Sequence, residues 1–234
     1  SQTDVLGDLT AEAEQVAEQI RDIEKQLDRR QSSSPLDVEQ LNWLRDGLIA
    51  SWQDPDARGR ILFFHHPPYV TEATKWAQGQ TLAVRRNLRN VLTAVQGEIG
   101  PPAQFSPPRP LVDLVITGHA HCLEHLQTGA NQLADAHIDY IVCGGSGYSL
   151  RRQRTHGLEI KEGVGRQVQT VATSRRYIGR MGHGSDKRRP YSCLRVEVRA
   201  GNPPVFVAQP VVAEKAHHQW KTYRDAPLDL QAKF

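Results

Sequence analysis

The sequence predicts a layered α/β fold built on a mixed β-sheet. Two short apolar runs, residues 61–64 and 111–117, are typical of strands that are buried on both faces. They alternate with two segments of helical periodicity, residues 35–51 and 80–96. Late in the chain, residues 194–212 alternate apolar and polar side chains on either side of a Gly-Asn-Pro-Pro turn, as an antiparallel hairpin does. Helices that alternate with buried strands indicate α/β layers.

The two helices have recognisable starts and buried faces. Ser34 is the expected N-cap of the first helix and Pro35 occupies its first turn. Leucines at positions 41, 44 and 48 form the buried face of that helix. The helix at 80–96 has an apolar stripe at helical spacing, which consists of Val84, Leu88, Val91, Leu92 and Val95.

Three further segments complete the expected organisation. Residues 10–30 have a narrow apolar stripe, so residues 1–34 are expected to form a helical insertion or arm. Residues 138–143 are a third buried strand, which is closed by the glycine-rich stretch 144–147. Residues 148–190 have weak periodicity and many arginines and glycines, and we expect a long basic excursion there.

The composition excludes several classes of protein. The hydrophobic fraction of 38% and the charged fraction of 24% are those of globular proteins. No apolar run approaches the ~20 residues that cross a bilayer, so no membrane partner is expected. Three cysteines without paired spacing argue against a disulfide framework and fit the cytoplasm, although the sequence does not fix the compartment.

Charge is distributed unevenly along the chain. The net charge of +3 is too small to indicate a nucleic-acid partner, but residues 151–189 contain eleven Lys or Arg against three acids. This excess of positive charge suits an anionic substrate. Alternatively, residues 151–189 are simply a solvated loop. Tyr177 and Tyr191 are candidates for stacking on bases. We do not expect nucleic acid, because no recognised nucleic-acid motif is present.

Histidines close two of the predicted strands. The run 61–64 leads directly into His65 and His66, and the run 111–117 leads into Gly-His-Ala-His at 118–121. In layered α/β folds the ligands lie beyond the carboxyl ends of the strands. Neutral imidazole is a good ligand for Zn, Mn and Fe. The sequence therefore predicts a metal site where these strands end.

Four segments, in this order, resemble the calcineurin-like metallophosphoesterases, including the purple acid phosphatase branch. They are a helix at 39–48, a strand ending in His-x-Pro at 61–69, a strand ending in Gly-His-x-His at 114–121 and a glycine-rich strand end at 140–147. The resemblance implies the second half of an αββα sandwich, two packed sheets flanked by helices.

The same resemblance implies a chemistry and a set of ligands. His65 and His119 would bind one ion of a dinuclear centre and His121 the other, with Mn, Fe or Zn as the two divalent or trivalent ions. The reaction would be hydrolysis of a phosphate monoester or diester in a small molecule or another phosphoester substrate.

Four other residues are weaker candidates for the site. His66 either protonates the leaving group or has a supporting role. Tyr69 either lies at the edge of the pocket or packs in the core. Arg151 and Arg152 follow the glycine-rich turn, where they either bind phosphate or are solvated.

The chain lacks the earlier motifs of this family, which are Asp-x-His, Gly-Asp-x-x-Asp and Gly-Asn-His. An Asp-Ala-His sequence occurs at 135–137, but downstream of the Gly-His-Ala-His turn, so we interpret it as chance. Residues 35–234 are therefore expected to be the C-terminal half of a domain whose partner is its own N-terminal half. We expect the isolated chain to be inactive. The alternative is a non-catalytic metal-binding or interaction module on the same fold.

Overall fold

A computed structural model describes residues 37–230, except 102–103, 106–107, 131–132, 148, 164, 184–185 and 217–218, together with a few positions between 13 and 24. The arm expected at 1–34 therefore lies outside the described residues, apart from those few positions. Within the described part the fold is mixed α/β. It has a six-stranded mixed sheet, a three-stranded antiparallel sheet and the two predicted helices.

The six-stranded sheet contains the three apolar strands that the sequence predicts. These are β1 (Ile61–Phe64), β2 (Leu114–Thr117) and β4 (Asp139–Cys143), and they pair in parallel. The expectation that residues 61–64 are buried on both faces is wrong, because Phe63 is exposed and its three neighbours in the strand are half-buried. The sheet continues with three antiparallel strands, in the spatial order β3 (Leu123–Gln127), β6 (Gln169–Ile178) and β5 (Glu159–Glu162).

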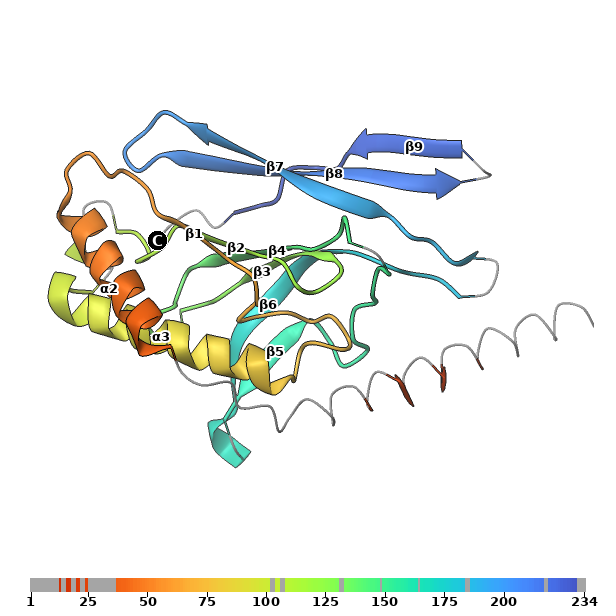
Figure 1. Ribbon diagram of the computed structural model, residues 1–234, viewed down its shortest axis with the longest axis horizontal. Helices are drawn as coiled ribbons and strands as arrows, with labels where there is room; N and C mark the ends of the chain where they lie inside the picture. The colour runs from red at the N-terminus through yellow and green to blue at the C-terminus, as the bar shows by residue number, and fades with distance from the viewer. Residues whose placement is uncertain are drawn as a thin grey trace, which may run out of the picture.

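The helices and the small sheet cover opposite faces of the six-stranded sheet (Figure 1). Helices α2 (Val38–Gln53) and α3 (Gly79–Ile99) pack their apolar faces on side chains such as Val115 of β2. On the other face, Leu114 packs with Ala208 of the small sheet. That sheet is formed by β7 (Tyr191–Arg199), β8 (Val205–Ala216) and β9 (Gln219–Arg224). The predicted hairpin is thus confirmed as β7 and β8.

Both helices differ in detail from the expectation. Asp37, and not Ser34, is the N-cap of α2, and its carboxylate accepts a hydrogen bond from the Gln40 backbone N–H at 2.9 Å. In α3 the buried stripe includes Arg85, while Val84 is only half-buried. A cation thus takes a core position, and the contacts that stabilise it are described below.

The segment expected to be a basic excursion contains regular structure. Strands β5 and β6 lie within residues 148–190, and β6 pairs with β3 over most of its length. Register shifts interrupt the pairing between His125 and Leu126 and between Ile160 and Lys161. Such irregularities break the two-residue alternation on which strand prediction depends, which is why the sequence pattern looked aperiodic.

No helix within the described residues is both long and apolar enough to span a membrane.

Candidate metal site

The parallel pairing of β1 with β2 brings the two histidine turns together. Residues 61–64 pair in register with residues 114–117, so both strands end at the same edge of the sheet. The Gly118 backbone N–H then donates to the His65 carbonyl at 3.0 Å, which continues the pairing one step beyond the strands. As predicted from the sequence, His65 and His119 are neighbours.

Three imidazoles form a cluster at this edge. Their ring centroids are 4.8 Å apart for His65 and His66, 5.1 Å for His65 and His119, and 4.3 Å for His66 and His119. One candidate ligand atom from each ring lies within 4.8 Å of the others. Two ligands on opposite sides of one ion span at most ~4.2 Å, so the cluster is only slightly wider than a closed site.

One pair of ring nitrogens already has the spacing of two metal ligands. His119 Nδ1 lies 3.2 Å from His65 Nε2. Nitrogens that each lie ~2.1 Å from one ion are about 3.0 to 3.4 Å apart in octahedral or tetrahedral geometry. The same separation suits an N–H···N hydrogen bond when one nitrogen carries the proton. The geometry is thus compatible with one shared ion and with an imidazole pair.

The Gly-His-Ala-His turn is compact and fits closely against the glycine-rich turn that follows β4. His119 has a φ of 60°, in the left-handed region that non-glycine residues seldom adopt. A Cβ added to Gly144 would lie 1.9 Å from the Ala120 carbonyl oxygen. The Gly144 N–H also donates to the Cys122 carbonyl at 2.9 Å. The glycine-rich stretch is therefore required for a steric reason, because side chains there would clash with the histidine turn.

His66 is half-buried, and its environment favours the neutral ring. Burial lowers the pKa of His66, and the neighbouring His65 and Lys75 lower it further because they disfavour another positive charge. A neutral imidazole can offer a lone pair to a metal, whereas an imidazolium cannot.

His121 does not belong to this cluster, and Arg151 and Arg152 make contacts elsewhere. His121 Nδ1 lies 3.2 Å from the Ser149 carbonyl oxygen, and the His121 carbonyl accepts from the Arg151 N–H at 2.9 Å. The Arg152 guanidinium donates to the Gly182 carbonyl. Arg151 is half-buried, and its charge lowers the pKa of Glu72.

Tyr69 has no exposed surface. Its ring packs edge-on against Tyr140, with centroids 4.9 Å apart, and its hydroxyl donates to Asp135. Of the two roles that the sequence left open for Tyr69, this position corresponds to packing in the core. We therefore do not propose Tyr69 as a substrate contact. Tyr177, one of the two tyrosines considered for stacking on bases, is half-buried, and its hydroxyl donates to the Arg151 carbonyl.

Two buried carboxylates lie behind the histidine turn and were not predicted. Glu72 and Glu124 have no exposed surface. Burial raises the pKa of each to about 7, although hydrogen bonds from Thr74 to Glu72 and from Thr71 and Ser174 to Glu124 oppose the shift. Neither carboxylate had a signal in the sequence, because Glu124 lies in a strand that also contains His125 and Gln127, and Glu72 lies in an irregular segment.

No protein-family model and no curated protein sequence matches this chain.

Proposed function

We propose that the chain binds a divalent or trivalent metal ion (Mn, Fe or Zn) and provides the histidine side of a metallophosphoesterase centre. His65 and His119 are the proposed ligands, and His66 adds a third imidazole within reach. The observation that carries the proposal is the 3.2 Å separation of His119 Nδ1 and His65 Nε2, at the ends of adjacent parallel strands. The resemblance of the four ordered segments supplies the reaction class.

The proposed reaction is hydrolysis of a phosphate monoester or diester. Ions held at this edge would polarise a phosphoryl oxygen and activate a water. His121, which lies two residues after His119 in the sequence, is the proposed ligand of a second ion. Arg151 is half-buried beside His121 and is the proposed contact for substrate phosphate, because its guanidinium is a strong donor to phosphate oxygens.

The proposed partner is the half of the domain that carries the family's acidic motifs. In the described sheet β1 pairs on one side with β2, and its other side is an edge. Phe63 of β1 is 69% exposed there. A further strand at this edge would end beside His65, where its carboxylates would complete the ligand set. The finer fold that we propose is accordingly the second half of the metallophosphoesterase sandwich.

The second candidate function is a non-catalytic metal-binding module. It is favoured by the composition of the cluster, because within the described residues no carboxylate belongs to it. Three neutral imidazoles bind a transition metal well, but they leave no bridging ligand for a second ion.

Titration with Co²⁺, followed by visible absorption, tests the metal site. We expect one strong equivalent for the 234-residue chain, and its loss in His65→Ala and in His119→Ala. His156→Ala is the matched control, because His156 is an exposed histidine outside the cluster. Equal Co²⁺ affinity in the wild-type protein and both cluster variants would overturn the proposal.

An activity assay separates the two candidate functions. The chain is assayed on a generic aryl phosphate with Mn, Zn or Fe, alone and with a polypeptide that carries the three acidic motifs. We expect little turnover by the chain alone and chelator-sensitive turnover by the mixture. Metal binding without turnover in either case would favour the non-catalytic module. Robust turnover by the chain alone would contradict the view that the partner half is needed.

A further inference from the structure

The segment that follows His66 is irregular, yet it is buried along its whole length. Residues 67–72 are all buried and belong to no helix or strand. An irregular segment normally lies at the surface, because its backbone groups need hydrogen-bond partners that the interior seldom supplies. Pro67 and Pro68 reduce this demand, since neither has an N–H. The remaining groups must be satisfied by the protein around them.

Arg85 supplies one of these partners from helix α3. Its side chain is 3% exposed, and its Nε donates to the Pro68 carbonyl at 2.8 Å. Its guanidinium carbon lies 4.5 Å from the centroid of the Tyr69 ring, within the range of a cation–π contact. Its charge is balanced by Glu162 of β5, at 2.5 Å.

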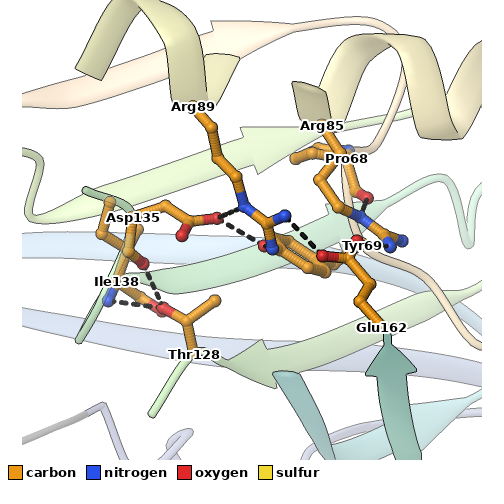
Figure 2. Close-up of polar contacts among 8 residues, drawn as sticks. All are labelled: Pro68, Tyr69, Arg85, Arg89, Thr128, Asp135, Ile138 and Glu162. Carbon is orange, nitrogen blue, oxygen red and sulfur yellow. Dashed lines mark hydrogen bonds and ion pairs between the residues drawn. The ribbon is translucent and has the colours of Figure 1, made fainter. Parts of the chain in front are cut away.

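Arg89, one helical turn after Arg85, contacts Tyr69, which is the next residue of the buried segment. Figure 2 shows the Arg89 side chain between Asp135 and Glu162. Its Nε lies 2.9 Å from Asp135 Oδ2 and its Nη1 lies 2.5 Å from Glu162 Oε2. Arg89 Nη2 donates to the Tyr69 hydroxyl, which in turn donates to Asp135. Burial and the adjacent carboxylate raise the pKa of Tyr69, so the phenol stays a donor.

These five side chains form a neutral network that joins three parts of the fold. The network consists of Tyr69, Arg85, Arg89, Asp135 and Glu162. Its two cations come from α3, one acid from β5 and the other from the loop before β4. Two cations balanced by two acids leave no net charge in the interior, which is the condition under which buried charges are tolerated. The network therefore fixes residues 68 and 69 against α3 and β5.

We propose that Arg85 and Arg89 are positioning residues for the metal site, acting through Pro68 and Tyr69 on the turn that carries His65 and His66. The inference rests on the proposed metal-binding function. The two imidazole-bearing turns are joined by the hydrogen bond from Gly118 to His65, but each has a further support of its own: residues 118–121 fit against Gly144, and residues 65–66 continue into the buried segment 67–72. Metal ligands must be held to within ~0.5 Å of their binding positions. Loss of the contacts that support one turn would therefore move its imidazoles away from the other ligands.

Two variants remove polar contacts of the network with little change in the shape of the side chain. Tyr69→Phe deletes only the hydroxyl, and Arg85→Met keeps most of the aliphatic stem. Leu92→Ala is the control, because Leu92 lies on the same helix, is 1% exposed and has no polar side-chain group that could join the network. It lowers stability by leaving a cavity. Each variant is measured for thermal stability and, below its unfolding transition, for Co²⁺ affinity and visible spectrum.

We expect Tyr69→Phe and Arg85→Met to weaken Co²⁺ binding about 10-fold or more and to alter the spectrum, as loss of outer supporting groups does at metal sites. Leu92→Ala should lower the melting temperature and leave both Co²⁺ readouts unchanged. Wild-type affinity and spectrum in the two network variants would overturn the positioning role. If Arg85→Met fails to fold, the near-isosteric Tyr69→Phe decides. Absence of stoichiometric Co²⁺ binding in the wild-type chain would instead overturn the metal-binding function itself.

Discussion

His119 combines a strained backbone with a proposed chemical role. Its φ of 60° brings the Cβ close to the following carbonyl, which costs about 1–2 kcal/mol for a residue other than glycine. Strain of this kind persists only where the surroundings hold it, and it is concentrated at functional sites. At this position the imidazole and the conformation are both needed to bring Nδ1 towards His65.

Replacing His119 by glycine should therefore change the stability of the protein and its binding of metal in opposite directions. We expect His119→Gly to raise the free energy of unfolding by up to ~1 kcal/mol, because glycine adopts this φ without strain but gains entropy in the unfolded chain. The same variant should lose Co²⁺ binding. Urea unfolding measures the first effect and visible absorption the second.

His121→Gly is the matched control, since His121 is not among the described residues with positive φ. It should destabilise the protein. If His119→Gly destabilises it by as much as His121→Gly does, the turn carries no strain at residue 119.

Some residues of the site could be predicted from the sequence, and others could not. His65 and His119 were predictable because they follow short apolar runs by one and two residues, and parallel strands end at one edge. Arg85 and Glu124 were not, because a buried charge follows no periodic pattern: its position depends on partners far away in sequence, such as Glu162 for Arg85 and Thr71 for Glu124. The positive φ of His119 also has no signature in the sequence.

At the scale of elements, two glycines illustrate opposite constraints. Gly144 leaves no room for a Cβ, because the Ala120 carbonyl is already in its place. Gly47 lies inside helix α2, and an added Cβ there would meet nothing within 4 Å. The first glycine is required by the packing of two turns, whereas the second only weakens a helix.

Alanine at these two positions should have effects of opposite sign. Gly144→Ala should destabilise the protein and weaken Co²⁺ binding, because the Gly-His-Ala-His turn must move. Gly47→Ala should stabilise it by about 0.5–1 kcal/mol, the difference in helix propensity, and leave binding unchanged. Thermal unfolding and Co²⁺ titration of the two variants check this. A neutral Gly144→Ala would show that the glycine-rich turn does not set the geometry of residues 118–121.

The elements that the sequence predicts are those with clean periodicity. Strands β1, β2 and β4 are uninterrupted and largely apolar, and α2, α3 and the β7–β8 hairpin follow regular patterns. Strands β3, β5, β6 and β9 were missed. Register shifts interrupt the pairing of β3 with β6 and of β5 with β6, and β9 is exposed at every position. The predicted start of α2 was also wrong, because Asp37, and not Ser34, is the N-cap of the helix.

At the scale of the whole molecule, two buried carboxylates make stability depend on pH. The pKa of Glu72 and of Glu124 is raised from 4.5 to about 7 by burial, and the charge of Glu72 raises the pKa of Glu124 further. Lys75 and Arg151 act against the shift at Glu72, while Thr71 and Ser174 act against it at Glu124. Below pH 4.5 both groups are protonated in the folded and the unfolded chain. Between pH 4.5 and about 7 only the unfolded chain readily releases these protons.

The free energy of unfolding should therefore fall as the pH rises from about 4.5 to about 7, by on the order of 3 kcal/mol for each of the two groups. Glu124→Gln imitates the protonated form, so it should reduce this slope and be more stable than the wild-type chain at pH 8. Urea unfolding at a series of pH values gives both slopes. Parallel curves for the two proteins would contradict a raised pKa at Glu124.

The position of β4 has a consequence for how the chain reaches this fold. In the sheet β4 lies between β2 and β3, although both precede it in the chain. The sheet therefore cannot grow by adding each new strand to an edge, and β2 and β3 become part of one sheet only when β4 pairs with both. Pairing of this non-local kind slows folding, since loops must close before contacts form. During synthesis, the turn at 118–121 can pack against Gly144 only after that residue has left the ribosome.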